Sequence, residues 1–161
     1  MLARAALKAR VKKEMPKRSP IEPTEANLLA GAPLYQQHCA VCHGLPGETQ
    51  TAIAQGMFPP PPQLFHGKGV TDDEPGESYW KVFNGIRLTG MPSFKDQLSA
   101  TEMWQVSLLL AYADKPMPPT ALQILHNAPA PPTGKHTQPA PPEQPPLKST
   151  PFPDTPEEPE Q

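Results

Sequence analysis

The stretch HCAVCHGLPG, residues 38–47, contains both cysteines of the 161-residue chain. Cys39 and Cys42 are three residues apart, and His43 directly follows the second cysteine. Cysteines at this spacing can form a redox disulfide, provide half of a zinc site, or anchor a haem whose iron the histidine binds. Each of these three sites needs further residues or a particular fold, so the rest of the sequence helps to distinguish them.

The surrounding sequence gives little support to the thiol and zinc alternatives. A thioredoxin-like pair needs a βαβ arrangement, whereas a helical segment leads into this motif. A disulfide across so short a loop stabilises little, because loop-closure entropy grows with loop length. Zinc needs four tetrahedral ligands, which adjacent residues of one turn cannot easily provide. The haem interpretation uses all three residues, because two thiols can form thioethers and the imidazole can bind the iron.

Proline and charge divide the chain into three parts. Of the 26 prolines, 15 lie from Pro116 onward, where the missing backbone donor argues against helix or strand. Residues 119–161 are therefore predicted to be a disordered, acidic, proline-rich tail, with its role as spacer, docking ligand or tether left open. Residues 1–23 are predicted to be a basic, proline-punctuated linker. Their lack of interleaved aromatic residues argues against a nucleic-acid partner.

The packed part of the chain, residues 24–118, is predicted to consist of helices and loops. The expected helices cover residues 24–38, 76–86 and 99–115. Thr24 is a suitable N-cap, and Ser99 with Glu102 fits a capping box. Pro33 is expected to kink or interrupt the first helix, because it removes one backbone hydrogen bond. No alternating strand pattern is visible, so the sequence predicts an all-α fold.

The pentapeptide CAVCH and the downstream TGMPSF, residues 89–94, resemble the class I c-type cytochromes. Members of this family are small monohaem electron carriers in which a methionine from a Gly-Met-Pro loop is the sixth iron ligand. The resemblance implies covalent haem c at Cys39 and Cys42, with His43 and Met91 as axial ligands. It covers residues 24–118 and implies the cytochrome c fold, in which three to five short helices surround one haem.

The resemblance also implies which residues surround the haem. A proline carbonyl in the run FPPPPQL, residues 58–64, would accept the N–H of the ligand histidine, with Pro60 and Pro61 as the candidates. Gly31 and Tyr35 resemble the small-plus-aromatic pair that lets the first helix cross the last one closely. The aromatic residues expected to line or cover the ring are Tyr79, Trp80, Phe94 and Trp104. Ordinary core packing is an equal alternative for each aromatic residue.

The resemblance implies an electron carrier and not an enzyme, because an iron with two protein ligands has no open position for substrate. Its expected partners are redox proteins of a respiratory or dehydrogenase chain, and a haem subunit of a larger oxidoreductase is the alternative. A zinc or thiol module without haem is the remaining alternative. Haem c is attached outside the cytoplasm, so a periplasmic or membrane-associated protein is expected. Because residues 1–23 contain no apolar signal region, we expect a signal or membrane anchor upstream of them.

Overall fold

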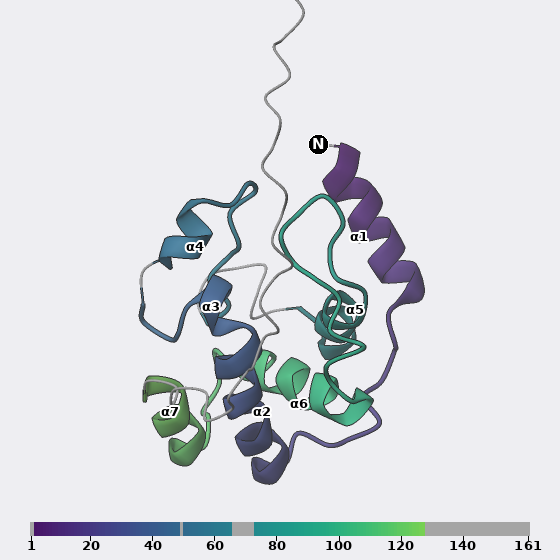
Figure 1. Ribbon diagram of the computed structural model, residues 1–161. Helices are drawn as coiled ribbons and strands as arrows, with labels where there is room; N and C mark the ends of the chain where they lie inside the picture. Colours follow the sequence, from purple (N-terminus) through teal and green to yellow (C-terminus); the bar gives the residue numbers. More distant parts are fainter. Residues whose placement is uncertain (1, 49, 66–72, 128–161) are drawn as a thin grey trace, which may run out of the picture. The chain divides into compact units, whose positions relative to one another are not determined.

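The computed structural model describes residues 2–48, 50–65 and 73–127. The helices within these ranges are α1 (Leu2–Glu14), α2 (Glu25–His38), α3 (Ala40–His43), α4 (Ala52–Gln55), α5 (Pro75–Asn84), α6 (Ala100–Leu110) and α7 (Pro119–His126) (Figure 1). The described residues contain no strand, and the predicted all-α class is confirmed. Helices α2 to α6 fall within residues 24–118, which agrees with the three to five helices expected there. Within the described ranges, no helix is long and apolar enough to cross a bilayer.

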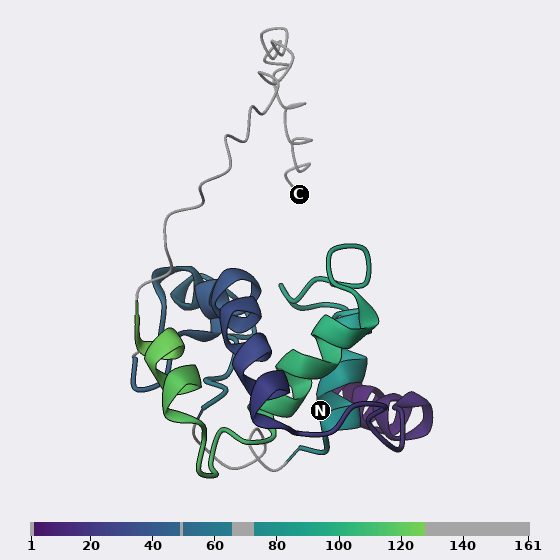
Figure 2. The ribbon, with the colours of Figure 1, turned by 90° about the horizontal axis from the view of Figure 1, so that it is seen from below.

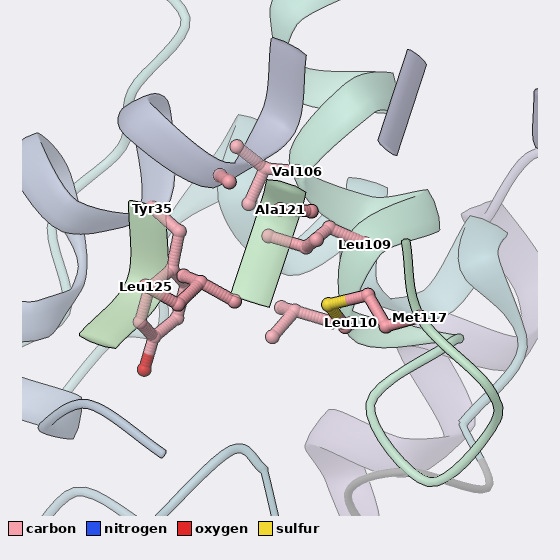
Figure 3. Packing of buried hydrophobic residues seen from close by; sticks show 8 residues of the cluster. Tyr35, Val106, Leu109, Leu110, Met117, Ala121 and Leu125 are labelled. Atoms are coloured by element: carbon pink, nitrogen blue, oxygen red, sulfur yellow. The ribbon is translucent and has the colours of Figure 1, made fainter. Parts of the chain in front are cut away.

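The crossing of α2 and α6 brings two backbones into contact. A methyl group added to Gly31 of α2 would lie 2.5 Å from the carbonyl oxygen of Gln105 in α6 and 3.2 Å from the Cβ of Leu109. The prediction that Gly31 permits a close crossing is therefore confirmed. Tyr35, one turn further along α2, is fully buried with Leu109 in the same core cluster (Figure 3).

Local capping signals place the starts of α2 and α6 correctly, whereas α6 ends at Leu110, before the predicted end at residue 115. The Thr24 hydroxyl accepts the N–H of Asn27 at 3.3 Å and so caps α2. Ser99 and Glu102 form the predicted capping box at the start of α6. Hydrogen bonds from Ser99 lower the pKa of the Glu102 carboxyl, because they stabilise its charged form. Pro33 lies inside α2 without ending it, since the helix continues to His38.

The prediction of a tail from residue 119 is wrong for α7. Ala121 and Leu125 of this helix are fully buried and pack in the core with Tyr35 of α2 (Figure 3). The side-chain amide of Gln36 also donates to the carbonyl of Asn127 at 2.6 Å. Prolines are compatible with the start of this helix, because the first turn needs no N–H donor. Residues 128–161 of the predicted tail lie outside the described residues.

The prediction of a linker over residues 1–23 is wrong for α1, which packs against α5 (Figure 1, Figure 2). Val11 is only 1% exposed. The indole Nε1 of Trp80 in α5 donates to the Glu14 carboxylate at 3.2 Å, and the Arg10 guanidinium lies 5.6 Å from the Trp80 ring centroid. Beyond the helix, a methyl group on Gly76 would meet the Pro16 carbonyl oxygen. The basic composition of this segment conceals the one residue, Val11, that is buried among the described side chains of the helix.

We expect Gly31→Ala to lower the free energy of unfolding by about 1–3 kcal/mol, because the added methyl group must push α2 away from Gln105. Urea denaturation of the haem-loaded protein measures this change. Gly56→Ala is the control, since a methyl group there would lie 3.6 Å from its nearest neighbour, the Ile53 carbonyl oxygen. Equal effects of the two substitutions would contradict the close crossing.

We expect Leu125→Ala to cost about 2–5 kcal/mol of stability, because it removes a fully buried side chain of α7. Gln123→Ala on the exposed side of the same helix should change stability little. Denaturation curves of the two variants provide the comparison. If Leu125→Ala is as mild as its control, α7 does not belong to the core.

Candidate functional site

The two cysteines and His43 lie on one helical turn. Cys39 ends α2 and precedes α3, and its carbonyl accepts the N–H groups of Cys42 at 3.1 Å and His43 at 2.9 Å. Residues three apart on a helix share a face, so this turn presents both thiols to the same side. Both cysteines are half-buried free thiols. Two thiols placed in this way can each form a covalent bond to the same flat ligand.

The first cysteine lacks the character of a redox-active thiol. Burial raises the pKa of the Cys39 thiol to about 12, and the nearby Cys42 adds to this increase. Reactive cysteines in disulfide exchange have lowered pKa values and are thiolates near neutral pH. Cys39 is protonated under these conditions, which disfavours the thioredoxin-like interpretation.

His43 is oriented by a carbonyl from the proline run. Its Nδ1 lies 2.7 Å from the carbonyl oxygen of Pro62. A carbonyl can only accept, so Nδ1 carries the hydrogen and Nε2 keeps its lone pair. Burial lowers the pKa of His43, while the hydrogen bond to Pro62 partly opposes this shift. At neutral pH the ring is therefore the neutral imidazole that metal ligation requires.

The choice of Pro60 or Pro61 as the carbonyl partner of His43 is wrong, because Pro62 occupies that position. Residues 59–62 are four consecutive prolines with the same backbone chemistry. Only the path of the loop decides which carbonyl reaches the imidazole, and a family pattern without an alignment does not fix that path.

The turn after His43 is held from two sides. The Tyr35 hydroxyl donates to the carbonyl of Gly44 at 2.7 Å in the protein interior. Gly44 has φ +74°, which favours glycine, and a methyl group there would lie 2.9 Å from Nε2 of Gln63. The edge of Phe65 packs against Tyr35 with ring centroids 4.9 Å apart. Helix α2 and the segment after the prolines thus fix the position of the imidazole together.

The loop that contains Met91 folds back onto the end of α5. The carbonyl oxygen of Met91 accepts a hydrogen bond from the N–H of Ile86 at 3.1 Å. The N–H of Met91 donates to the Thr89 hydroxyl at 3.2 Å. The Ser93 hydroxyl donates to the Phe83 carbonyl at 2.6 Å. These bonds hold the Met91 backbone on its α5 side.

The structure brings the Met91 loop close to the cysteine turn. Met91 packs in an apolar cluster around the buried Phe94, whereas Cys39 packs against the core cluster of α2 and α6. Leu34 contacts both clusters and so connects them. The ring of His38, directly before Cys39, lies edge-on to Phe94 with centroids 6.2 Å apart. The sequence motifs, about fifty residues apart, therefore meet in space.

The predicted pocket aromatics separate into two groups. Tyr79 packs in the cluster with Met91 and Phe94, and it stacks on Trp104 with centroids 4.2 Å apart. Trp80 instead makes the α1 contacts with Glu14 described above. Consecutive helical residues point about 100° apart, and the two rings make contacts with different elements. The contacts of Trp80 are those of the α1 interface and not those of the predicted pocket.

The residues present fit a covalent haem. The turn offers two thiols on one side and a neutral imidazole with a free Nε2. In addition, the buried Nε2 of Gln63 has no hydrogen-bond partner among the described residues. This amide lies beside Gly44 and can donate to a polar group of a ligand. Neither Gln63 nor Pro62 stands out in the sequence, because their roles depend on the path of the loop.

A crossing of two helices at a glycine, a Cys-x-x-Cys-His turn and a nearby methionine loop define a c-type cytochrome domain. The family model described as "Cytochrome C oxidase, cbb3-type, subunit III" matches residues 26–109, and the chain belongs to this family. The predicted cytochrome c fold is thereby confirmed. The chain is an electron carrier that binds haem c covalently, and such domains are typically extracytoplasmic.

A solved structure from Kuenenia stuttgartiensis, a reducing HAO-like protein complex, contains a chain of similar fold. The two chains are 29% identical with a TM-score of 0.52, and the match covers 59% of this chain and 47% of the other. This chain therefore spans about half the length of that relative. The search of curated proteins found no match.

We expect Tyr35→Phe to lower the free energy of unfolding by about 1–3 kcal/mol, because the buried Gly44 carbonyl loses its hydrogen bond. Denaturation of the haem-loaded protein measures the loss. Tyr112→Phe, at a half-buried position after α6, is the control and should be nearly neutral. If Tyr35→Phe leaves the free energy of unfolding unchanged, the hydroxyl does not hold this turn.

Proposed function

We propose that the chain carries single electrons on one haem c bound through Cys39 and Cys42, with His43 and Met91 as axial iron ligands. The observation that carries the proposal is the hydrogen bond between His43 Nδ1 and the Pro62 carbonyl. It fixes the tautomer in which Nε2 is free for the metal and increases the donor strength of the imidazole. Haem c, when bound, supplies the iron couple that accepts and releases the electron.

The residues around Met91 support its role as the second ligand. Met91 is partly buried and packs against an apolar cluster that contains Phe94 and the buried Met103. A thioether is a weak, soft donor, so His and Met ligation favours the reduced state and raises the reduction potential. Apolar burial acts in the same direction, because it disfavours the additional positive charge of the oxidised form. A haem iron bound by both His43 and Met91 would have no ligand position left for substrate, so these residues would serve electron transfer and not substrate binding.

We propose that the chain transfers electrons in an extracytoplasmic respiratory or dehydrogenase pathway as part of a larger oxidoreductase. The support is that the family model describes an oxidase subunit and the matched solved structure is a protein complex. Independent diffusion between redox proteins is the alternative. Affinity purification of the tagged chain from its native host distinguishes the two, since a subunit should retain redox proteins in fixed stoichiometry. Recovery of the holoprotein alone would favour the diffusing carrier.

We expect Met91→Leu to abolish the weak red absorption band of the oxidised protein, because this band reports the iron–sulfur bond. The pyridine haemochrome spectrum should still show one covalent haem per chain, because the cysteines are unchanged. Met103→Leu is the matched control, since Met103 is 2% exposed in the same cluster and should keep the band. A band that survives in Met91→Leu excludes Met91 as a ligand, and a chain without covalent haem refutes the attachment site.

A further inference from the structure

We propose that Met57 is a positioning residue for Met91, and that it acts through Gly90. The proposal deepens the function proposed above, because it assumes that the Met91 thioether binds the iron. Met57 precedes the proline run and is far in sequence from the methionine loop. Its position next to that loop is apparent only in the structure.

The evidence is a direct contact between Met57 and the residue before Met91. A methyl group added to Gly90 would lie 2.0 Å from Cε of Met57 and 3.6 Å from its sulfur. The terminal methyl of Met57 therefore occupies the space that a side chain at position 90 would need. A side chain at position 90 would therefore displace the end of the Met57 side chain, although the φ of Gly90 is outside the left-handed region.

Met57 adds a contact to a loop that α5 already holds. A hydrogen bond from the Ile86 N–H fixes the Met91 carbonyl, and the Thr89 hydroxyl accepts the N–H of Met91. Among the described residues, a side chain at position 90 would point toward Met57. Removing the Met57 side chain would remove the contact beside Gly90 and leave the loop free to shift there.

The position of Met57 is itself linked to the cysteine turn. Its N–H donates to the Ala54 carbonyl at 3.2 Å, immediately after α4. Thr51 caps α4, and its hydroxyl also donates at 2.9 Å to the carbonyl of Val41, which lies between the two cysteines. Met57 is therefore placed by the same backbone that carries the thiols.

The segment from Met57 to Pro62 consequently touches the surroundings of both proposed axial ligands. Its first residue packs on Gly90 beside Met91, and its last residue accepts the hydrogen bond from His43. Because the iron–thioether bond is weak, a small displacement of the Met91 loop should be enough to open it to a competing ligand. The methionine side chain suits this contact, since its unbranched thioether adapts to irregular gaps.

The test measures how easily added imidazole replaces the sixth ligand in the oxidised, haem-loaded protein. Met57→Ala should increase the imidazole affinity about tenfold, weaken the red band and lower the reduction potential. Met57→Leu should retain near wild-type values, because leucine and methionine are similar in volume. Ile53→Ala is the matched control on the neighbouring helix, where the side chain is 52% exposed, and it should change none of these values.

A second pair of variants tests the contact itself. Gly90→Ala should increase imidazole affinity less than Met57→Ala does, because the new methyl group displaces the flexible end of the Met57 side chain without removing it. The double variant Met57→Ala with Gly90→Ala should recover toward wild type, because the alanine methyl fills the space that Met57 leaves. Purely additive effects of the two substitutions would overturn the proposal.

The outcomes separate this proposal from the function on which it rests. If Met57→Ala changes only the free energy of unfolding, and not the imidazole affinity, the red band or the potential, Met57 is a packing residue and the proposal fails. The proposed function then still stands, provided that Met91→Leu loses the red band. If the band survives in Met91→Leu, the proposed function fails first and the positioning role fails with it.

Discussion

The contact between Gly31 and the backbone of Gln105 is the constraint on which the rest of the structure depends. It allows α2 and α6 to cross at a separation that no larger residue at position 31 would permit. Helix α2 leads directly into the cysteine turn, and the loop before α6 carries Met91. The angle and depth of this one crossing therefore determine where the two candidate ligand segments meet. The other described helices extend the same arrangement, since α7 packs on α2 and α5 packs on α6.

The imidazole of His43 depends on contacts from separate parts of the chain. Tyr35 holds the following residue through the Gly44 carbonyl, and Pro62 holds the ring through Nδ1. The tyrosine belongs to a rigid helix, whereas the proline belongs to a loop whose residues have restricted backbone angles. Both restraints lower the number of orientations open to the ring before any metal binds. The site is thus prepared for ligation by the apolar core and by the proline run together.

Features that depend on residues close in sequence could be predicted, and those that depend on distant partners could not. Thr24 and the Ser99 capping box concern neighbouring backbone groups, so the sequence contains the whole interaction. Helix α7 was missed because the burial of Leu125 depends on Tyr35, which lies ninety residues away. Helix α1 was missed because its contacts with α5 depend on Trp80, which lies far from the helix in sequence.

The same distinction applies within the candidate site. The motif residues are adjacent in sequence, and the pentapeptide alone indicates their chemistry. The carbonyl partner of His43 was assigned to the wrong proline, because four consecutive prolines differ only in their position along the loop. Tyr79 and Trp80 were assigned together, yet the two rings make contacts with different elements.

A site for electron transfer benefits from ligands that keep their positions when the charge of the metal changes. Preorganised groups need little rearrangement when the electron is transferred, because folding has already fixed their positions. The backbone bonds on either side of Met91 and the carbonyl bond to His43 are restraints of this kind. Since they originate in the residues after α5 and in the proline run, the rigidity of the site is a property of the connected fold. The two proposed ligand motifs are consequently coupled through the protein, although the sequence presents them as separate.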